Sequence, residues 1–149
     1  MGPRELKLIE ESGGVTRFEV FDLERIHDSR GTLHVAEIAR LGGLPFQRCY
    51  FITGVPEGER RGGHAHKHHS EYLVCVQGSL EVSITSSSET VTVALAPVGR
   101  ALYVPAGYWR ELHAFSSDAI VLVLASHPFD ESDYLRDWDA FRRWEAQPT

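Results

Sequence analysis

The sequence predicts an all-β fold, a small sandwich or barrel, followed by one α-helix. Between about residues 15 and 126, apolar residues recur at every second position in many short runs, which is the spacing of half-buried strands. Glycine and proline turns separate the runs, as at 54–58 and 105–107. After this region the period changes, and large apolar residues recur at helical spacing: Tyr134, Leu135, Trp138, Phe141 and Trp144.

The strands are expected wherever alternation or a short apolar run occurs. In chain order these segments are 15–21, 33–38, 48–53, 64–66, 72–76, 80–85, 91–95, 101–104, 111–115 and 119–125. Asp130 with acids in the following turn predicts the start of the helix, which we expect over about 131–145.

Composition limits the classes of function. The chain has 149 residues, 42% of them hydrophobic and 24% charged, which fits one domain over 1–149. A formal net charge of −6 argues against a nucleic-acid or anionic-membrane partner. No apolar run has the length of a membrane helix and the first residues lack an apolar signal region, so we expect a cytoplasmic protein. Cys49 and Cys75 stand in apolar runs and are expected to be buried, reduced thiols.

The segment Arg61-Gly62-Gly63-His64-Ala65-His66-Lys67 is the most informative one. Side chains alternate faces along a strand, so His64 and His66 point the same way. Two imidazoles aimed into one cavity can transfer a proton or hold a metal ion.

The spacing around these histidines is that of a known motif. Gly58, His64, His66, Glu71 and Gly78 fit G-x5-HxH-x4-E-x6-G at every position. This is similar to the first motif of the cupin superfamily, and the resemblance implies a double-stranded β-helix (jelly-roll) barrel.

The second cupin motif, G-x5-PxG-x2-H, matches in part. Gly99, Pro105 and Gly107 stand in place, but Arg110 occupies the histidine position. A metal-dependent cupin, such as an oxygenase, would use His64, His66 and Glu71 as ligands. A guanidinium cannot coordinate and repels a cation, which weakens the metal hypothesis and leaves it open.

A closer resemblance follows from segments in order along residues 18–143. They resemble the nucleotide-sugar 3,4-ketoisomerases that act on dTDP-4-keto-6-deoxyglucose. The segments are Asp28–Gly31, Leu44–Phe46, Arg48–Ile52, Arg61–Lys67, Leu73–Cys75, Gly107–Trp109, Phe115–Asp118, Leu124–Ser126 and Asp133–Tyr134.

The resemblance implies the reaction and several roles. His64 and His66 would move protons between C3 and C4 of the hexose. Arg61 would lie near the hexose or the developing oxyanion, and Arg30 would bind the pyrophosphate, although a solvated turn residue is an equal alternative for Arg30. No external cofactor is implied.

Further side chains are expected around the pocket. Arg48 and Tyr50 share a strand face and are expected to line it, and Trp109 is expected to form a pocket wall. His68 and His69 follow Lys67 in a turn, where we expect solvated residues.

The chain departs from the family pattern at three positions. Phe51 stands where a second tyrosine is common, Glu71 where a glutamine is typical, and Arg110 where a histidine is typical. Glu71 and Arg110 are expected to compensate each other as a buried pair and to contact the substrate.

The sequence therefore predicts a cupin isomerase. We expect it to form a homodimer, because an N-terminal strand can cross to a partner. Its ligand would be a dTDP-linked 4-keto-6-deoxyhexose. A metal-dependent cupin enzyme and a non-catalytic sugar-nucleotide binding module remain as alternatives.

Overall fold

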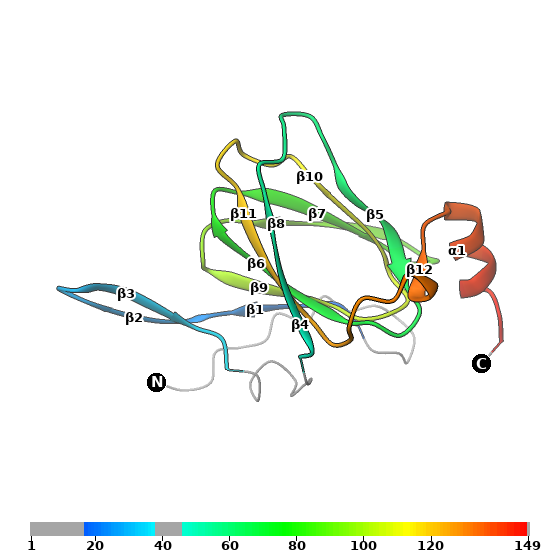
Figure 1. Cartoon of the computed structure of the whole chain (residues 1–149), viewed down its shortest axis with the longest axis horizontal. Coiled ribbons are helices and arrows are strands. Elements are labelled where there is room, and N and C mark those ends of the chain that lie inside the picture. Colours follow the sequence, from blue (N-terminus) through cyan, green and yellow to red (C-terminus); the bar gives the residue numbers. More distant parts are fainter. Residues whose placement is uncertain (1–16, 38–45, 149) are drawn as a thin grey trace.

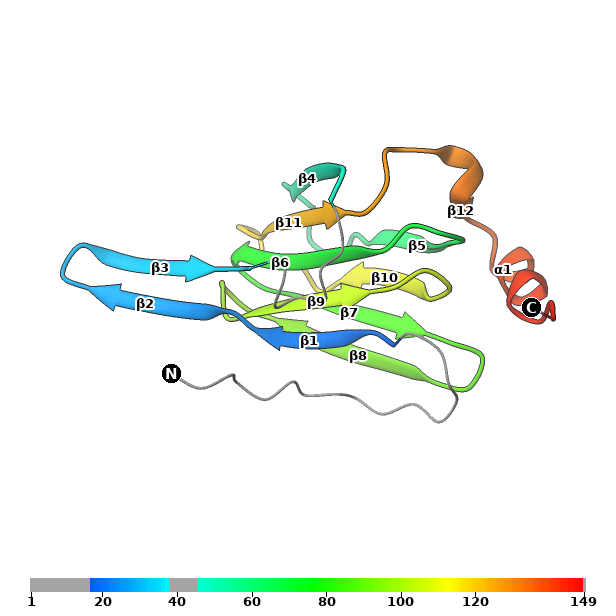
Figure 2. The same cartoon turned by 90° about the horizontal axis from the view of Figure 1, so that it is seen from below.

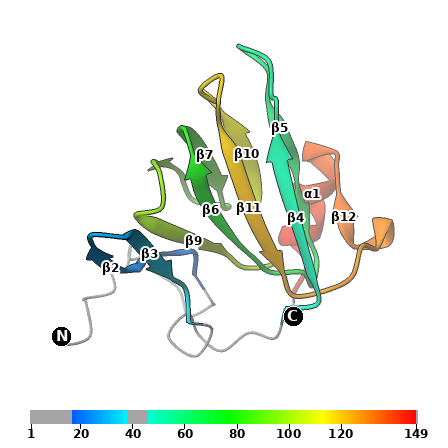
Figure 3. The same cartoon turned by 60° about the vertical axis from the view of Figure 1, so that its left-hand side comes forward.

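Two antiparallel sheets face each other and enclose the core, as Figures 1 and 3 show. The computed structural model describes residues 17–37 and 46–148. The first sheet has the order β1-β9-β6-β11-β4. Its strands are β1 (Glu19–Asp22), β9 (Arg100–Val104), β6 (Glu71–Gln77), β11 (Ile120–Ala125) and β4 (Arg48–Thr53).

The second sheet has the order β12-β5-β10-β7-β8. Its strands are β12 (Tyr134–Leu135), β5 (Arg61–His66), β10 (Trp109–His113), β7 (Leu80–Thr85) and β8 (Thr90–Leu95). Strands distant in sequence are neighbours in both sheets, which is the arrangement of a jelly-roll barrel. The predicted cupin fold is confirmed.

A hairpin extends away from the barrel. Strands β2 (Glu24–Asp28) and β3 (Gly31–Val35) pair with each other in a separate two-stranded sheet. Figures 1 and 2 show this hairpin, in blue, reaching past the end of both main sheets. The prediction placed one strand over 33–38. The structure adds β2, which pairs with β3 and is connected to it by the tight turn between Asp28 and Gly31.

The core lies between the sheets and is aliphatic over most of its length. Strand alternation gives this directly: β7 buries Leu80, Val82 and Ile84, and β11 buries Val121 and Val123. Because this part of the interior is filled by side chains, polar chemistry is confined to the end of the barrel where β5 ends and β6 begins.

The C-terminal region differs from the single helix predicted over 131–145. Asp130 does cap a first turn, but that turn is a 3₁₀ segment, η2 (Glu131–Asp133), and stops after three residues. The chain then forms β12, and the α-helix α1 (Trp138–Glu145) begins after its own cap, Asp137. The helical prediction was wrong over 134–135 because β12 pairs with β5, a long-range contact that local periodicity does not report.

Two smaller predictions have separate outcomes. Cys75 is buried as expected, whereas Cys49 is exposed because it faces outward from the edge strand β4. Within the described residues, no helix is long and apolar enough to cross a membrane.

Candidate active site

Polar side chains from both sheets meet at one end of the barrel. Arg48 and Tyr50 on β4 are paired with Ala125 and Val123 of β11, both fully buried, so all four share the inner face of the first sheet. Glu71 of β6 also pairs with Ala125 and lies on the same face. The predicted shared face of Arg48 and Tyr50 is confirmed.

The second sheet faces them with its own set. His64 is the register partner of Arg110, and His66 is the register partner of Tyr134. Cross-strand partners point to the same side of a sheet, so these four side chains all face the first sheet. The site is therefore built across the gap between the sheets.

A glycine bulge shapes the start of β5. The register slips between Arg110 and Glu111, so that Glu111 pairs with Gly62 and His64 stays opposite Arg110. Gly62 and Gly63 both have positive φ, and a Cβ on Gly62 would lie 2.8 Å from the Arg110 carbonyl oxygen. Glycine at 62 is required by this close approach, and the bulge sets which way His64 is presented.

A buried ion pair anchors the site. Nη1 of Arg110 donates to Oε1 of Glu71 at 2.7 Å, and the side chains are 1% and 3% exposed. Nη2 of Arg110 donates to the carbonyl oxygens of Pro105 and Tyr108. The pairing predicted for these two residues is confirmed.

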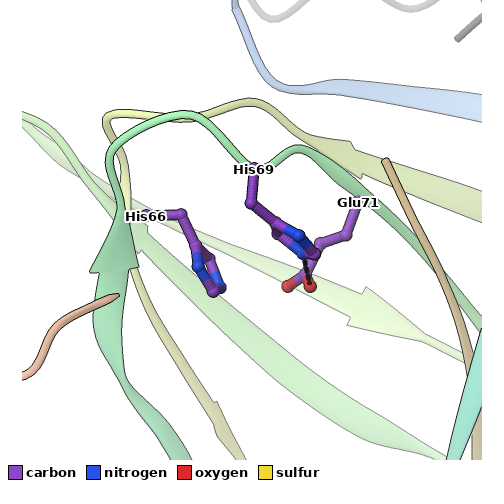
Figure 4. Close-up of side chains that lie close together, drawn as sticks. All are labelled: His66, His69 and Glu71. Carbon is purple, nitrogen blue, oxygen red and sulfur yellow. Dashed lines mark hydrogen bonds and ion pairs between the residues drawn. The ribbon is translucent and has the colours of Figure 1, made fainter. Parts of the chain in front are cut away.

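The second carboxylate oxygen of Glu71 is also engaged. The Tyr50 hydroxyl donates to Oε2 at 3.2 Å, and Nε2 of His69 lies 3.0 Å from the same atom. Figure 4 shows His69 between His66 and Glu71. Glu71 on β6 thus contacts Arg110 on β10 of the other sheet and His69 in the turn that follows β5.

The two predicted catalytic imidazoles stand edge to face. The ring centroids of His64 and His66 are 4.8 Å apart, and the Tyr134 ring packs on both, at 4.9 and 4.4 Å. The ring of His69 lies 4.2 Å from that of His66. Their shared orientation, predicted from strand alternation, is confirmed.

Burial keeps these histidines neutral. Burial first, and then the charge of Arg110, lower the pKa of His64 to about 4 and that of His66 to about 2. For Glu71, burial acts in the opposite direction, but the Arg110 charge and the His69 hydrogen bond outweigh it and hold the pKa well below its usual range. Burial and the neighbouring Glu71 charge raise the pKa of Tyr50, so its hydroxyl stays protonated.

A cavity of about 180 Å³ opens at this end of the barrel. Its lining is a single mixed set of basic, acidic and aromatic side chains: Arg48, His66, His68, His69, His127, Pro128, Asp130, Asp133 and Tyr134. The Arg48 guanidinium lies over the rings of Tyr50 and Phe129, and its Nε is buried without a hydrogen-bond partner. Arg48 lines the cavity, where its guanidinium can meet an anionic or carbonyl oxygen.

Of the nine predicted site residues, His66 and Arg48 line this cavity, His64, Tyr50, Glu71 and Arg110 contact them or one another beside it, and three lie elsewhere. Trp109 neighbours Arg110 on β10 and so faces the outer side of the sheet, where it packs on Trp138 and Phe141 under α1. The prediction that Trp109 forms a pocket wall was wrong. Arg61 begins β5 as an exposed residue outside the cavity lining.

Arg30 lies at the tip of the β2–β3 hairpin. Its side chain is 88% exposed and forms an ion pair with Asp28 at 2.6 Å. Figure 1 shows that this tip and β12 are at opposite ends of the chain's fold. Arg30 therefore does not reach the cavity of its own chain.

Of the nine residues that line the cavity, only Arg48 and His66 were predicted as site residues; the most consequential of those missed are His69, Asp133 and Tyr134. His69 was expected to be solvated but is buried, because the turn after β5 folds inward. Its position two residues before Glu71 could have predicted this burial. If the extended backbone of β6 begins before Glu71, residues 69 and 71 point to the same face. Asp133 and Tyr134 belong to the resemblance segments but were assigned to the helix.

The donor set allows the metal hypothesis to be tested. Ligand atoms of His66, His69 and Glu71 lie within 4.8 Å of one another. However, both carboxylate oxygens of Glu71 and Nε2 of His69 already take part in hydrogen bonds. The buried Arg110 charge also lies next to the carboxylate. A divalent cation would have to displace these contacts beside a guanidinium, so the residues present fit proton transfer better than metal coordination.

The fold and the site together define a cupin barrel with a buried, neutral histidine pair facing a carboxylate–guanidinium pair. The chain belongs to the FdtA family, described as WxcM-like, C-terminal, which it matches over residues 16–146. This confirms the family predicted from the sequence.

Named relatives are similar over most of the chain. A TDP-4-oxo-6-deoxy-alpha-D-glucose-3,4-oxoisomerase of Aneurinibacillus thermoaerophilus is 36% identical over 129 residues, which are 87% of this chain and 93% of that protein. The crystal structure of a 3,4-ketoisomerase from Helicobacter canadensis has a TM-score of 0.83 at 29% identity and covers 87% of this chain and 98% of its own.

A third relative was solved with a sugar nucleotide. It is a histidine-to-asparagine mutant of the 3,4-ketoisomerase QdtA from Thermoanaerobacterium thermosaccharolyticum in complex with TDP-4-keto-6-deoxyglucose. Its TM-score is 0.83 at 28% identity, with 89% of this chain and 96% of that chain covered.

Proposed function

We propose that this protein is a sugar-nucleotide 3,4-ketoisomerase acting on TDP-4-keto-6-deoxyglucose. The observation that carries the proposal is the pair of inward-facing imidazoles, His64 and His66, with ring centroids 4.8 Å apart and pKa values lowered by burial. A neutral imidazole is a base at pH 7 and an acid once it has accepted a proton. The relatives that act on this sugar nucleotide support the choice of substrate.

The chemistry needs only proton movements. The C4 ketone acidifies the hydrogen on C3, one imidazole removes it, and the electron pair of that C–H bond forms the C3–C4 double bond of an enediolate. The proton on O3 passes to O4, and a proton is then delivered to C4. The C3 oxygen becomes the ketone, so atoms and electrons balance without an oxidant. Each acid or base group of this kind contributes a factor of about 10² to 10⁴.

Surrounding side chains give the sugar its orientation. Arg48 lines the cavity, and its guanidinium would donate to an oxygen of the substrate. Tyr134 covers both imidazoles and forms a wall against which a hexose face can pack. Glu71 and Arg110 hold the floor of the site through their mutual contact rather than through a free donor.

The direct test is incubation with TDP-4-keto-6-deoxyglucose, followed by proton NMR of the sugar. We expect a 3-keto product that forms with multiple turnovers. Tight binding without a new sugar signal would instead identify a binding module. Loss of turnover on chelation, with stoichiometric metal in the purified protein, would identify a metal enzyme.

We further propose that the chain works as a homodimer. A lone two-stranded hairpin is marginally stable in water, yet β2–β3 reaches beyond its own barrel and exposes the register partners Ile26 and Leu33, at 48% and 59%. Phe51 on the outer face of the edge strand β4 is 63% exposed. A second copy that packs on these residues would cover all three. Light scattering of the purified chain at several concentrations is the test, and a monomer throughout would contradict it.

In such a dimer the hairpin could bring Arg30 to the partner's cavity, where it would bind the pyrophosphate. Arg30→Ala should then raise KM with little change in stability, because the residue is exposed. Mixing Arg30→Ala and His66→Asn subunits tests whether Arg30 acts across the interface. Recovery of part of the activity in the mixture supports action in trans, and no recovery argues that each chain uses its own arginine.

A further inference from the structure

Asp133 is an acid that lies against His66 and, among the described residues, forms no ion pair with a lysine or arginine. It stands at the end of η2, directly before β12, and its side chain is 13% exposed. Its ion-pair contacts within the described residues are to His66 and His68 alone, with no lysine or arginine. By contrast, the charge of Glu71 is already balanced by Arg110.

Both oxygens of this carboxylate are fixed by the turn after β5. Oδ1 accepts from the backbone N–H of His68 at 2.8 Å and lies 3.0 Å from Nδ1 of the same residue. Oδ2 accepts from the backbone N–H of His69 at 3.2 Å. The main-chain oxygen of Asp133 accepts from Lys67, which ties the segment to the end of β5. The carboxylate is thus held against the strand that carries the histidines.

The other neighbour of Oδ2, besides the His69 amide, is the ring of His66. Nδ1 of His66 lies 3.3 Å from Oδ2, is closed to solvent, and forms no aligned hydrogen bond with any described group, Asp133 included. The other ring nitrogen of His66, Nε2, is not among the buried atoms that lack a partner, and the residue lines the cavity. Contacts of this kind are commonly loose in an empty site and tighten in the substrate complex.

We propose that Asp133 is a positioning residue for the proton transfer: it keeps the proton of neutral His66 on Nδ1 and leaves Nε2 as the basic nitrogen. This rests on the proposed function for its catalytic meaning. A carboxylate accepts but does not donate, so beside Nδ1 it selects the tautomer that carries hydrogen there. The same carboxylate stabilises the imidazolium that forms when Nε2 takes the substrate proton.

The other groups around His66 do not perform this task. Those that face it are His64, His69, Glu71, Arg110 and Tyr134. Arg110 opposes a positive charge on His66, and Glu71 is engaged by Arg110, His69 and Tyr50. Among the described residues, the one carboxylate recorded against Nδ1 of His66 is that of Asp133.

The test separates positioning from a purely structural role as a cap of the turn. Nitrogen-15 NMR of labelled protein reports the tautomer of each histidine, and the difference from His66→Asn assigns the signal. We expect Nδ1–H in the wild type. In Asp133→Asn, the amide can donate to Nδ1, so the signal should move to the Nε2–H form and kcat should fall by about 10-fold or more with KM changed less than about twofold.

Asp137→Asn is the matched control, since Asp137 also accepts from a backbone amide and has no recorded contact with a histidine in the described part of the chain. It should leave the His66 signal and kcat unchanged. A wild-type His66 that carries hydrogen on Nε2 overturns the proposal, even if the Asp133 variant does not fold. So does an Asp133→Asn enzyme with the wild-type tautomer and kcat. The tautomer is read without turnover, so a protein inactive on the sugar nucleotide would refute the proposed function separately.

Discussion

Arg110 and Glu71 reach toward each other from opposite sheets and meet at 2.7 Å in the interior of the barrel. The contact fills the place where a metal-binding cupin would have a histidine next to its glutamate, as the partial second motif indicates. One charge pair therefore both joins the two sheets at this end and, after burial, has the largest effect on the pKa values of His64 and His66.

Glu71→Gln should lower the free energy of unfolding by about 3 to 5 kcal/mol, because it leaves the Arg110 guanidinium buried and unpaired. Denaturant unfolding monitored by tryptophan fluorescence measures this. The double variant Glu71→Gln/Arg110→His, which removes the orphaned charge, should recover much of the loss. An unchanged melting temperature in the single variant would contradict the assigned role of the pair.

His64→Asn and His66→Asn should each reduce kcat by about 10² to 10⁴, since each removes one acid–base group. Binding of the sugar nucleotide, measured by calorimetry, should persist. His113→Asn is the control, because His113 binds Ser83 on the other face of β10. Full turnover in either of the first two variants would remove the basis of the proposed mechanism.

Acid should destabilise the protein before its carboxylates begin to protonate. The folded-state pKa of His64 lies at about 4 and that of His66 at about 2, below the ordinary value of 6.5. Between pH 6.5 and about 4 the unfolded chain binds more protons, so stability falls as pH falls, by up to about 1.4 kcal/mol per pH unit for each histidine.

Unfolding free energies measured at pH 7.5, 6, 5 and 4.5 test this dependence. His66→Asn should show a shallower slope over the same range because one proton-linked group is missing. Equal slopes in the two proteins would mean that His66 is not held neutral in the folded state.

Trp109→Ala should act on stability and not on substrate binding. Trp109 is packed on Trp138 and Phe141 beneath α1, and removal of a buried aromatic side chain lowers stability by about 3 to 5 kcal/mol. KM measured below the melting transition should remain that of the wild type. A large rise in KM at unchanged stability would instead indicate that Trp109 contacts the substrate.

Chelation should leave turnover intact. The atoms that would bind a cation are engaged by Arg110, His69 and Tyr50, so dialysis against EDTA is expected to change neither kcat nor the melting temperature. Restoration of a lost activity by one divalent metal would support the metal-dependent alternative instead.

Strand alternation predicted correctly which of these side chains share a face, because alternation is a local property. It placed His64 with His66 and Arg48 with Tyr50, and the charge argument paired Glu71 with Arg110. The same rule, applied to Trp109 once Arg110 was placed inside, would have put the indole outside. Asp133 and Tyr134 were missed for a different reason: the pairing of β12 with β5 is a long-range contact that a helical spacing of aromatic residues conceals.

The short strand β12 has a consequence for how this enzyme can diversify. It seals the edge of β5, and the residues that touch the imidazoles, Asp133 and Tyr134, come from it and the residue before it. Lengthening or shortening the connection from 126 to 132 would therefore displace β12 at the sheet edge and, with it, the side chains of Asp133 and Tyr134 that contact the imidazoles. Inherited variation in that connection should be rare, and where it occurs it should coincide with a changed preference for the sugar.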